Sequence, residues 1–187
     1  MKGLRPMDDI VRQAMAKWPN VPDCFGWLGL DSRGQWHMRD DQVQHLGAFQ
    51  SGQTGAKGSV LRHEKLIDFI HRNYDADAQG RWYFQNGPQR VYIELEVAPY
   101  IWRLSETFEP TAHTGQATQV LACLVDETGR VYLQTTAGFG LVHTLDVGLV
   151  AEAIEKGLWT TEDCLSRELP ERFGFVISPQ QGEITSP

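Results

Sequence analysis

The chain has 187 residues, with 24 acidic and 17 basic side chains and a formal net charge of −7. This length allows one large domain or two small ones with a buried core. The acidic balance and the lack of a basic run argue against a nucleic-acid partner, and no apolar segment approaches the roughly 18–20 residues that span a bilayer.

The beginning of the chain and its cysteines predict a cytoplasmic protein. Residues 1–13 contain no apolar signal core. Cys24, Cys123 and Cys164 lie far apart and form no CxxC pair, so we expect reduced thiols in a reducing compartment.

The first elements in chain order are a predicted helix and a predicted strand. Residues 6–18 begin with a proline, carry two aspartates in the first turn and repeat apolar residues along one face. Residues 24–30 form an apolar run with two glycines, which is typical of a strand against which another group packs closely.

The same turn sequence, Asp-x-x-Gly, occurs three times, at residues 31–34, 77–80 and 126–129. Aspartate can hydrogen-bond the backbone of the turn, and glycine can adopt the positive φ that a hairpin with a bulge requires. Each turn is followed by a long polar residue, Trp or Val, and then His or Tyr. We therefore expect three β-hairpins, which reflect either an ancient duplication or the chance reuse of a favourable turn.

Residues 60–73 are predicted to form a helix, with Ser59 as its N-cap and an apolar face that includes Ile67 and Ile70. Residues 91–97 then alternate between apolar and polar side chains, the pattern of a half-buried antiparallel strand. The pattern places Glu94 and Glu96 on one face, about 6.6 Å apart by strand rise. This spacing would suit a glycosidase-like acid pair, but a solvated strand face explains both glutamates without a further assumption.

The last third of the chain predicts a hairpin followed by helices. Asp146 is expected to cap a helix that ends near Gly157, and Thr160 or Thr161 to begin a last short helix that stops at Pro170. Residues 173–177 are expected to add one strand.

These elements predict an α+β fold built from antiparallel hairpins in small sheets or half-barrels, with a linking helix and two β-rich parts. We expect an N-terminal helix at 1–20, a first hairpin-plus-helix subdomain at 21–75 and a larger β-rich subdomain with C-terminal helices at 76–187.

The stretch from Arg62 to Tyr74 and the stretch from Gly80 to Tyr92 resemble a family of small bacterial, specifically proteobacterial, proteins of unknown function. The chain is also distantly similar to the family called domain of unknown function 1285, through its order of hairpin, helix, hairpin and long strand ending in Ala98-Pro99-Tyr100. The resemblance covers roughly residues 18–135. It implies a bacterial cytoplasmic protein with a mixed α+β fold, and it carries over no catalytic residue.

The six histidines and three cysteines show no spacing typical of a metal site. His63 and His71 are two helical turns apart, about 12 Å by helix rise, which is too far for one ion without a further element between them. We expect neither a metal nor another cofactor.

Aromatic and arginine residues crowd the region from 81 to 103, a composition found at interaction surfaces. We expect a polar recognition patch for an acidic small ligand, a protein or a carboxylate-bearing peptide, although core packing with arginine stems over the rings is the alternative. In that alternative Arg90 pairs with Glu94 or Asp68. The candidate ligand-binding residues are Arg72, Asn73, Trp82, Asn86, Arg90 and Trp102.

Two functions from different classes remain open at this point. The sequence favours a binding or interaction module without catalysis, regulatory in character and open to homo-oligomer formation. The alternative is a hydrolase-like enzyme with a site between the two β-rich parts, for which no catalytic residue can be named.

Overall fold

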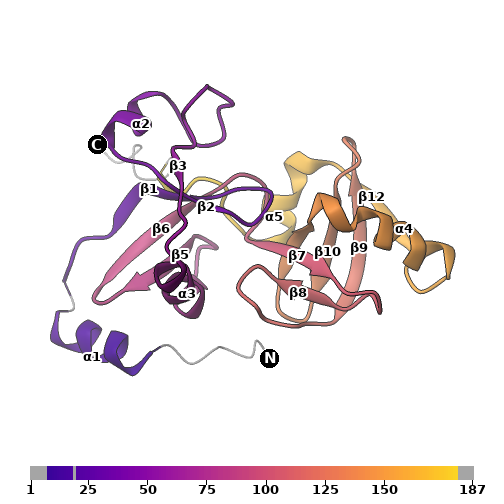
Figure 1. Cartoon of the computed structure of the whole chain (residues 1–187), viewed down its shortest axis with the longest axis horizontal. Helices are drawn as coiled ribbons and strands as arrows, with labels where there is room; N and C mark the ends of the chain where they lie inside the picture. The colour runs from indigo at the N-terminus through magenta and orange to yellow at the C-terminus, as the bar shows by residue number, and fades with distance from the viewer. Residues whose placement is uncertain (1–7, 19, 181–187) are drawn as a thin grey trace. The chain divides into compact units, whose positions relative to one another are not determined.

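The computed structural model of the protein describes residues 8–18 and 20–180, and the chain divides into two compact units. Of the described residues, unit 1 contains 32–34 and 97–174, and unit 2 contains the others. Each unit holds one six-stranded sheet (Figure 1). The predicted α+β class with two β-rich parts is confirmed, and neither sheet closes into a barrel within the described residues.

The sheet of unit 2 has the strand order β3-β2-β1-β6-β5-β4. Strands β1 and β6 run parallel, and the other neighbours pair antiparallel, so the sheet is mixed rather than purely antiparallel. Phe69 of helix α3 packs edge-on against Phe84 of β5, with the ring centroids 6.1 Å apart. The strands are β1 (Cys24–Leu30), β2 (Trp36–Met38), β3 (Ser59–Val60), β4 (Tyr74–Ala76), β5 (Trp82–Asn86) and β6 (Gln89–Leu95), and the helices are α1 (Asp9–Lys17), α2 (Asp41–His45) and α3 (Glu64–Arg72).

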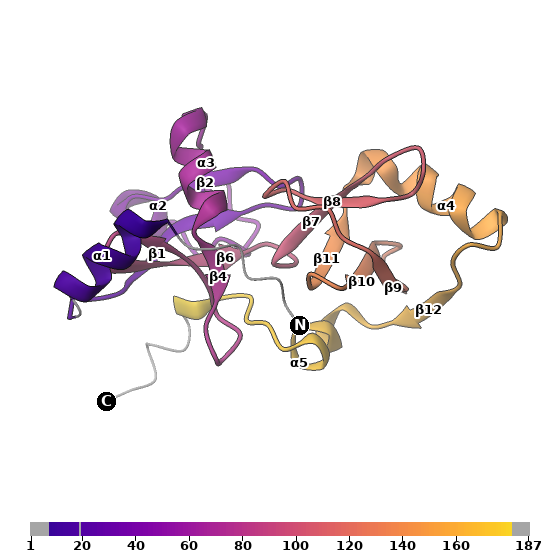
Figure 2. The same ribbon diagram turned by 90° about the horizontal axis from the view of Figure 1, so that it is seen from below.

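The sheet of unit 1 has the order β12-β9-β10-β11-β7-β8, with parallel pairing of β12 to β9 and of β11 to β7. Figure 2 shows helices α4 and α5 on opposite sides of strands β9–β11. Phe173 of α5 stacks on Phe139 of β11, with the centroids 4.0 Å apart. The strands are β7 (Tyr100–Leu104), β8 (Pro110–Ala112), β9 (Val120–Asp126), β10 (Val131–Thr135), β11 (Phe139–Val142) and β12 (Thr161–Cys164), and the helices are α4 (Val147–Glu155), α5 (Leu169–Phe173) and two 3-10 turns, η1 (Thr144–Asp146) and η2 (Ser166–Glu168).

All three Asp-x-x-Gly sequences lie at hairpin turns, as predicted: between β1 and β2, between β4 and β5, and between β9 and β10. In each turn the aspartate N–H donates to the carbonyl four residues later, at 2.9–3.0 Å. Gly34, Gly80 and Gly129 have φ values of 80°, 80° and 84°, which only glycine adopts without strain.

Strand β6 differs from its prediction, because it is buried on both faces. Tyr92 and Glu94, expected on a solvated face, are each 1% exposed. β6 lies at the centre of the sheet between β1 and β5. Phe25 stacks on Tyr92 at 4.6 Å, and Ser178 covers Glu94. Alternation along the strand is therefore real, but it separates two buried faces.

Helix α3 is confirmed, but it begins five residues after the predicted cap. Ser59 lies in β3, and His63 caps the helix, because its Nδ1 accepts a 3.2 Å hydrogen bond from the Leu66 N–H. Asp146 does precede α4, but its carboxylate makes no cap. It binds Arg103 Nε at 2.6 Å and the Leu104 N–H at 2.9 Å instead.

Two predicted elements near the C-terminal end are wrong. Thr161, one of the two expected helix starts, instead begins strand β12 and pairs with Cys123 of β9, and Thr160 lies just before that strand. The expected strand at 173–177 begins as the end of α5, which Gly174 closes in the left-handed conformation. Residues 175–180 belong to unit 2, where the Val176 N–H binds the Gly80 carbonyl at 2.9 Å.

The expected boundary between residues 75 and 76 lies inside β4, which pairs with β5 in unit 2. Strands β5 and β6, which were expected in the later subdomain, share the sheet of β1. None of the helices formed by residues 8–18 and 20–180 is both long and apolar enough to cross a membrane.

Candidate functional site

Arg72 and Asn73, the first two predicted site residues, lie together at the end of α3. Arg72 Nε is 3.3 Å from the Asp8 carboxylate, and Asn73 Nδ2 is 3.4 Å from the same group. Asn73 is 2% exposed and also donates to the Phe69 carbonyl at 3.0 Å. Its own carbonyl accepts from the Gln85 N–H at 3.0 Å. Asn73 therefore joins α3 to β5.

Trp82 and Trp102, the predicted aromatic members, are buried in different units. Trp82 packs 4.8 Å from the Tyr74 ring in unit 2. Trp102 in unit 1 has no exposed surface, and its indole N–H donates to the Leu133 carbonyl at 3.1 Å. Asn86 is exposed at the β5–β6 turn.

Arg90 meets aromatic partners rather than Glu94 or Asp68. Its guanidinium carbon lies 4.4 Å from the centre of the Tyr83 ring. Burial acts to lower the pKa of Arg90, but Tyr92, Tyr83 and the charge of Asp23 raise it above its ordinary value. The guanidinium therefore keeps its positive charge, and the carboxylate near it is that of Asp23.

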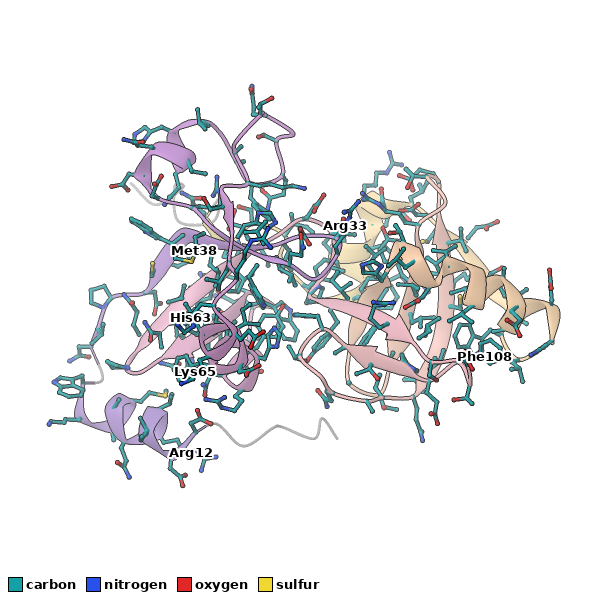
Figure 3. The ribbon with its side chains drawn as sticks, in the orientation of Figure 1. Arg12, Arg33, Met38, His63, Lys65 and Phe108 are labelled. Carbon is teal, nitrogen blue, oxygen red and sulfur yellow. The ribbon has the colours of Figure 1, made fainter. Side chains whose placement is uncertain are left out.

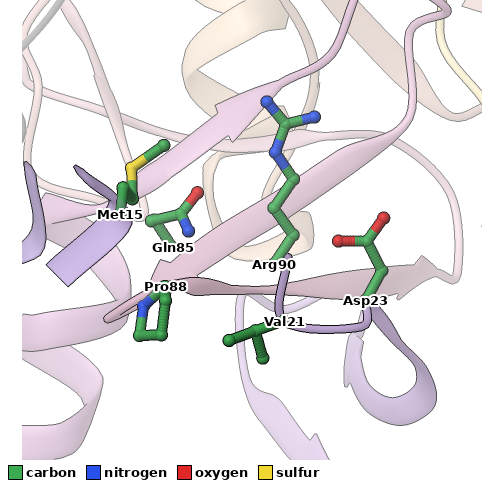
Figure 4. Close-up of a pocket in the computed structure, with 6 residues that line it drawn as sticks. All are labelled: Met15, Val21, Asp23, Gln85, Pro88 and Arg90. Carbon is green, nitrogen blue, oxygen red and sulfur yellow. The ribbon is translucent and has the colours of Figure 1, made fainter. Parts of the chain in front are cut away.

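A depression of about 340 Å³ opens beside Arg90 between α1 and the β5–β6 hairpin. We call it the Arg90 depression. Figure 4 shows Arg90 standing between Gln85 on one side and Asp23 on the other. Its lining residues are Met15, Val21, Asp23, Gln85, Pro88 and Arg90.

Gln85 supplies the least satisfied polar atom of this depression. The residue is 1% exposed, and its Nε2 donates to the Gly87 carbonyl at 3.0 Å, which fixes the orientation of the amide. Its Oε1 is buried and has no hydrogen-bond partner among the described residues. A buried acceptor without a partner costs about 1–3 kcal/mol.

Glu94 forms a second polar cluster in unit 2, away from the depression's lining. Its Oε1 accepts a hydrogen bond from the Ser178 hydroxyl. Burial raises the pKa of Glu94, although Ser178, the Gln180 backbone and the charge of Arg39 act in the opposite direction. Arg39 is 1% exposed, and its guanidinium donates to the carbonyls of Gly26, Gly47 and Ala56. These contacts join segments of the chain to one another, which is a structural role.

His63 and His71, the two histidines considered as metal ligands, make separate structural contacts. His63 lies at the start of α3 (Figure 3), where it caps the helix. His71 Nε2 accepts a 2.8 Å hydrogen bond from the Trp36 indole. Within the described residues no group of three or more His, Cys, Asp or Glu side chains is placed to hold a metal ion. The expected lack of a cofactor stays a prediction.

Comparison with known proteins identifies the family. Residues 7–180 match the family model DUF2944, described as a protein of unknown function (DUF2946). The chain belongs to DUF2944. The expected membership in a family of unknown function is thereby confirmed. No curated protein matches the DUF2944 chain.

Two solved structures similar to this DUF2944 chain carry the name of the family that its sequence resembles. A DUF1285 family protein from Silicibacter pomeroyi is 13% identical, with a TM-score of 0.46 over 79% of this chain and 85% of that chain. A DUF1285 family protein from Shewanella baltica is 12% identical, with a TM-score of 0.45 over 71% of this chain and 97% of that chain.

Sequence reasoning missed Asp23 and Gln85 in the DUF2944 chain. Gln85 is the first polar residue after the aromatic run of β5, and that position is its only signal. Asp23 precedes β1 and is far from Arg90 in sequence, so only the parallel pairing of β1 with β6 brings them together.

Proposed function

We propose that this protein is a non-catalytic binding module that takes a small ligand with an anionic group in the Arg90 depression. The observation that carries the proposal is the Arg90 guanidinium, a cation that lines the depression together with the polar side chains of Gln85 and Asp23. An arginine fork matches a carboxylate or phosphate in geometry and charge.

The size and composition of the depression support a small molecule. Its volume of about 340 Å³ is at the lower end of the range for ligand pockets, roughly 300–1,000 Å³. Met15, Val21 and Pro88 supply apolar contact, while Arg90, Asp23 and Gln85 supply polar groups. Half of the lining residues are therefore polar, which makes the depression more polar than the usual ligand pocket and suits a charged ligand.

A hydrolase with a glycosidase-like pair of acids receives less support from the same residues. A paired-acid mechanism needs two carboxyl groups about 5–10 Å apart across the substrate, whereas Asp23 is the one acid among the lining residues. The proposal keeps the cytoplasmic location expected from the sequence. A regulatory role and a homo-oligomer, also expected there, are compatible with it and form no part of its argument.

The test is a thermal-shift screen of the full chain against small carboxylates, amino acids and phosphate esters. The variants are Arg90→Ala and, as a matched control, Arg12→Ala, which removes an exposed arginine from α1 (Figure 3). We expect at least one acid to raise the Tm of the unaltered chain and of Arg12→Ala, but not of Arg90→Ala. The proposal fails if no acid acts, or if Arg90→Ala responds as fully as the control.

A further inference from the structure

We infer that the ligand of the Arg90 depression is a small zwitterion of the amino-acid type, with its carboxylate on Arg90 and its ammonium group on Gln85 Oε1 and Asp23. This inference rests on the proposed function and adds the chemical class of the ligand. It follows from the charges, from the orientation of Gln85 and from the apolar walls.

The charged groups of the depression are matched in number. Arg90 supplies one cation and Asp23 one anion, and the two side chains interact electrostatically. A ligand with only a carboxylate would satisfy Arg90 and would also place a second anion near Asp23. A ligand with opposite charges at its two ends meets both groups favourably, which is electrostatic complementarity.

The amide of Gln85 also favours a ligand with an ammonium group, because it offers an acceptor that needs a hydrogen-bond donor. Its Nε2 donates to the Gly87 carbonyl, so the other end of the amide, Oε1, can only accept. A plain carboxylate has no donor at neutral pH and would leave Oε1 unsatisfied. An ammonium group carries three donors, which allows it to bind Oε1 and to face Asp23 as well.

The remaining walls indicate an uncharged side chain on the ligand. Met15 comes from α1, Val21 precedes β1 and Pro88 lies in the β5–β6 turn. Methionine is unbranched and adapts its shape to different apolar groups. We therefore expect alanine, valine, leucine or methionine as free amino acids to represent the ligand class.

The experiment is calorimetric titration of the full chain with these four amino acids. Each is paired with the carboxylic acid of the same skeleton that lacks the amine, such as 4-methylpentanoate for leucine. We expect at least one amino acid to bind about tenfold or more tightly than its matched acid, the ratio that one charge-assisted hydrogen bond supplies. Asp23→Asn and Gln85→Met should each reduce this preference, and Arg90→Ala should weaken the amino acid and its matched acid alike.

The outcomes separate this inference from the proposed function. Equal binding of an amino acid and its matched acid, with loss of both in Arg90→Ala, overturns the zwitterion and leaves the proposed function intact. Binding of none of these compounds, while another acid in the thermal-shift screen does bind, also overturns the zwitterion alone. Absence of binding by every acid overturns both. The Tm of each variant without ligand verifies that it is folded.

Discussion

The Tyr132 hydroxyl donates a 2.7 Å hydrogen bond to Oδ2 of Asp126, six residues earlier in the chain. Oδ1 of the same carboxylate accepts from the N–H groups of Thr128 and Arg130, so one side chain joins the turn to the strand that follows. The first hairpin repeats this relation with Asp31 and His37, whose side chains lie 2.8 Å apart. The recurrence of His or Tyr six residues after each aspartate therefore has a physical basis in two of the three turns.

Asp126→Ala should lower the free energy of unfolding by about 1–3 kcal/mol, because it leaves the buried Tyr132 hydroxyl without its acceptor. Burial acts to raise the pKa of Asp126, but hydrogen bonds from Thr128 and Tyr132 hold it below its ordinary value. A carboxyl with a lowered folded pKa stabilises above its unfolded pKa, about 3.9, and this contribution disappears as the pH falls through the folded pKa. Urea unfolding at neutral and acidic pH measures both effects. Glu155→Ala, on the exposed face of α4, is the control, and equal losses in the two variants would contradict the prediction.

Glu94→Gln should change how stability depends on pH. Burial raises the pKa of Glu94, so the folded state binds a proton more tightly than the unfolded state. The free energy of unfolding of the unaltered chain should then fall as the pH rises from the unfolded pKa, about 4.3, through the folded pKa, by at most about 1.4 kcal/mol per pH unit. The variant should lack this decline and gain relative stability toward neutral pH. Parallel pH profiles of the two proteins, measured by urea unfolding, would show the idea to be wrong.

Gly29→Ala should destabilise unit 2 by about 1–3 kcal/mol, the usual cost of overpacking a core. A Cβ at this position would lie 2.5 Å from the ring of Phe49, which has no exposed surface. Gly148→Ala is the matched control, because it meets nothing within 4 Å on helix α4 and gains helix propensity. In thermal unfolding, Gly29→Ala should lower the Tm and Gly148→Ala should raise it. Similar Tm values would contradict the packing argument.

Arg39→Lys should lower the free energy of unfolding by about 3 kcal/mol, since lysine keeps the charge but cannot reach three carbonyls from one planar fork. The three acceptors belong to Gly26, Gly47 and Ala56, so the guanidinium ties residues 47–56 to β1. Arg12→Lys, at an exposed position of α1, is the comparison. Chemical unfolding that gave the same small change for both would remove the structural role.

Local chemistry made much of this fold predictable. The Asp-x-x-Gly turns, helix α3 and the close packing on the glycines of residues 24–30 follow from rules that act over a few residues. The solvated face assigned to Glu94 was wrong because strand order is set by distant residues. The sequence of β6 alternates in the same way whether its second face is exposed to water or is covered by Ser178.

The candidate site was harder to predict for the same reason. Arg90 was identified from its aromatic neighbours, and it does lie against Tyr83. Asp23 and Gln85 join it through the pairing of β6 with β1 on one side and β5 on the other. A single sequence contains no short-range signal for the parallel partner, since a parallel pair connects segments separated by many residues.

The return of the chain to unit 2 after Gly174 affects the order in which the protein forms during translation. The Leu95 N–H binds the Ile177 carbonyl at 2.9 Å, and Glu94 binds Ser178. About 80 residues separate these partners, which a ribosome adds in roughly 4–16 s at its usual rate. Until Ser178 has been synthesised, the Glu94 carboxylate in the nascent sheet of unit 2 lacks the hydroxyl that it binds in the complete protein. Unit 2 therefore completes its hydrogen bonding after unit 1 has been synthesised, against the usual order in which the N-terminal part of a chain finishes first.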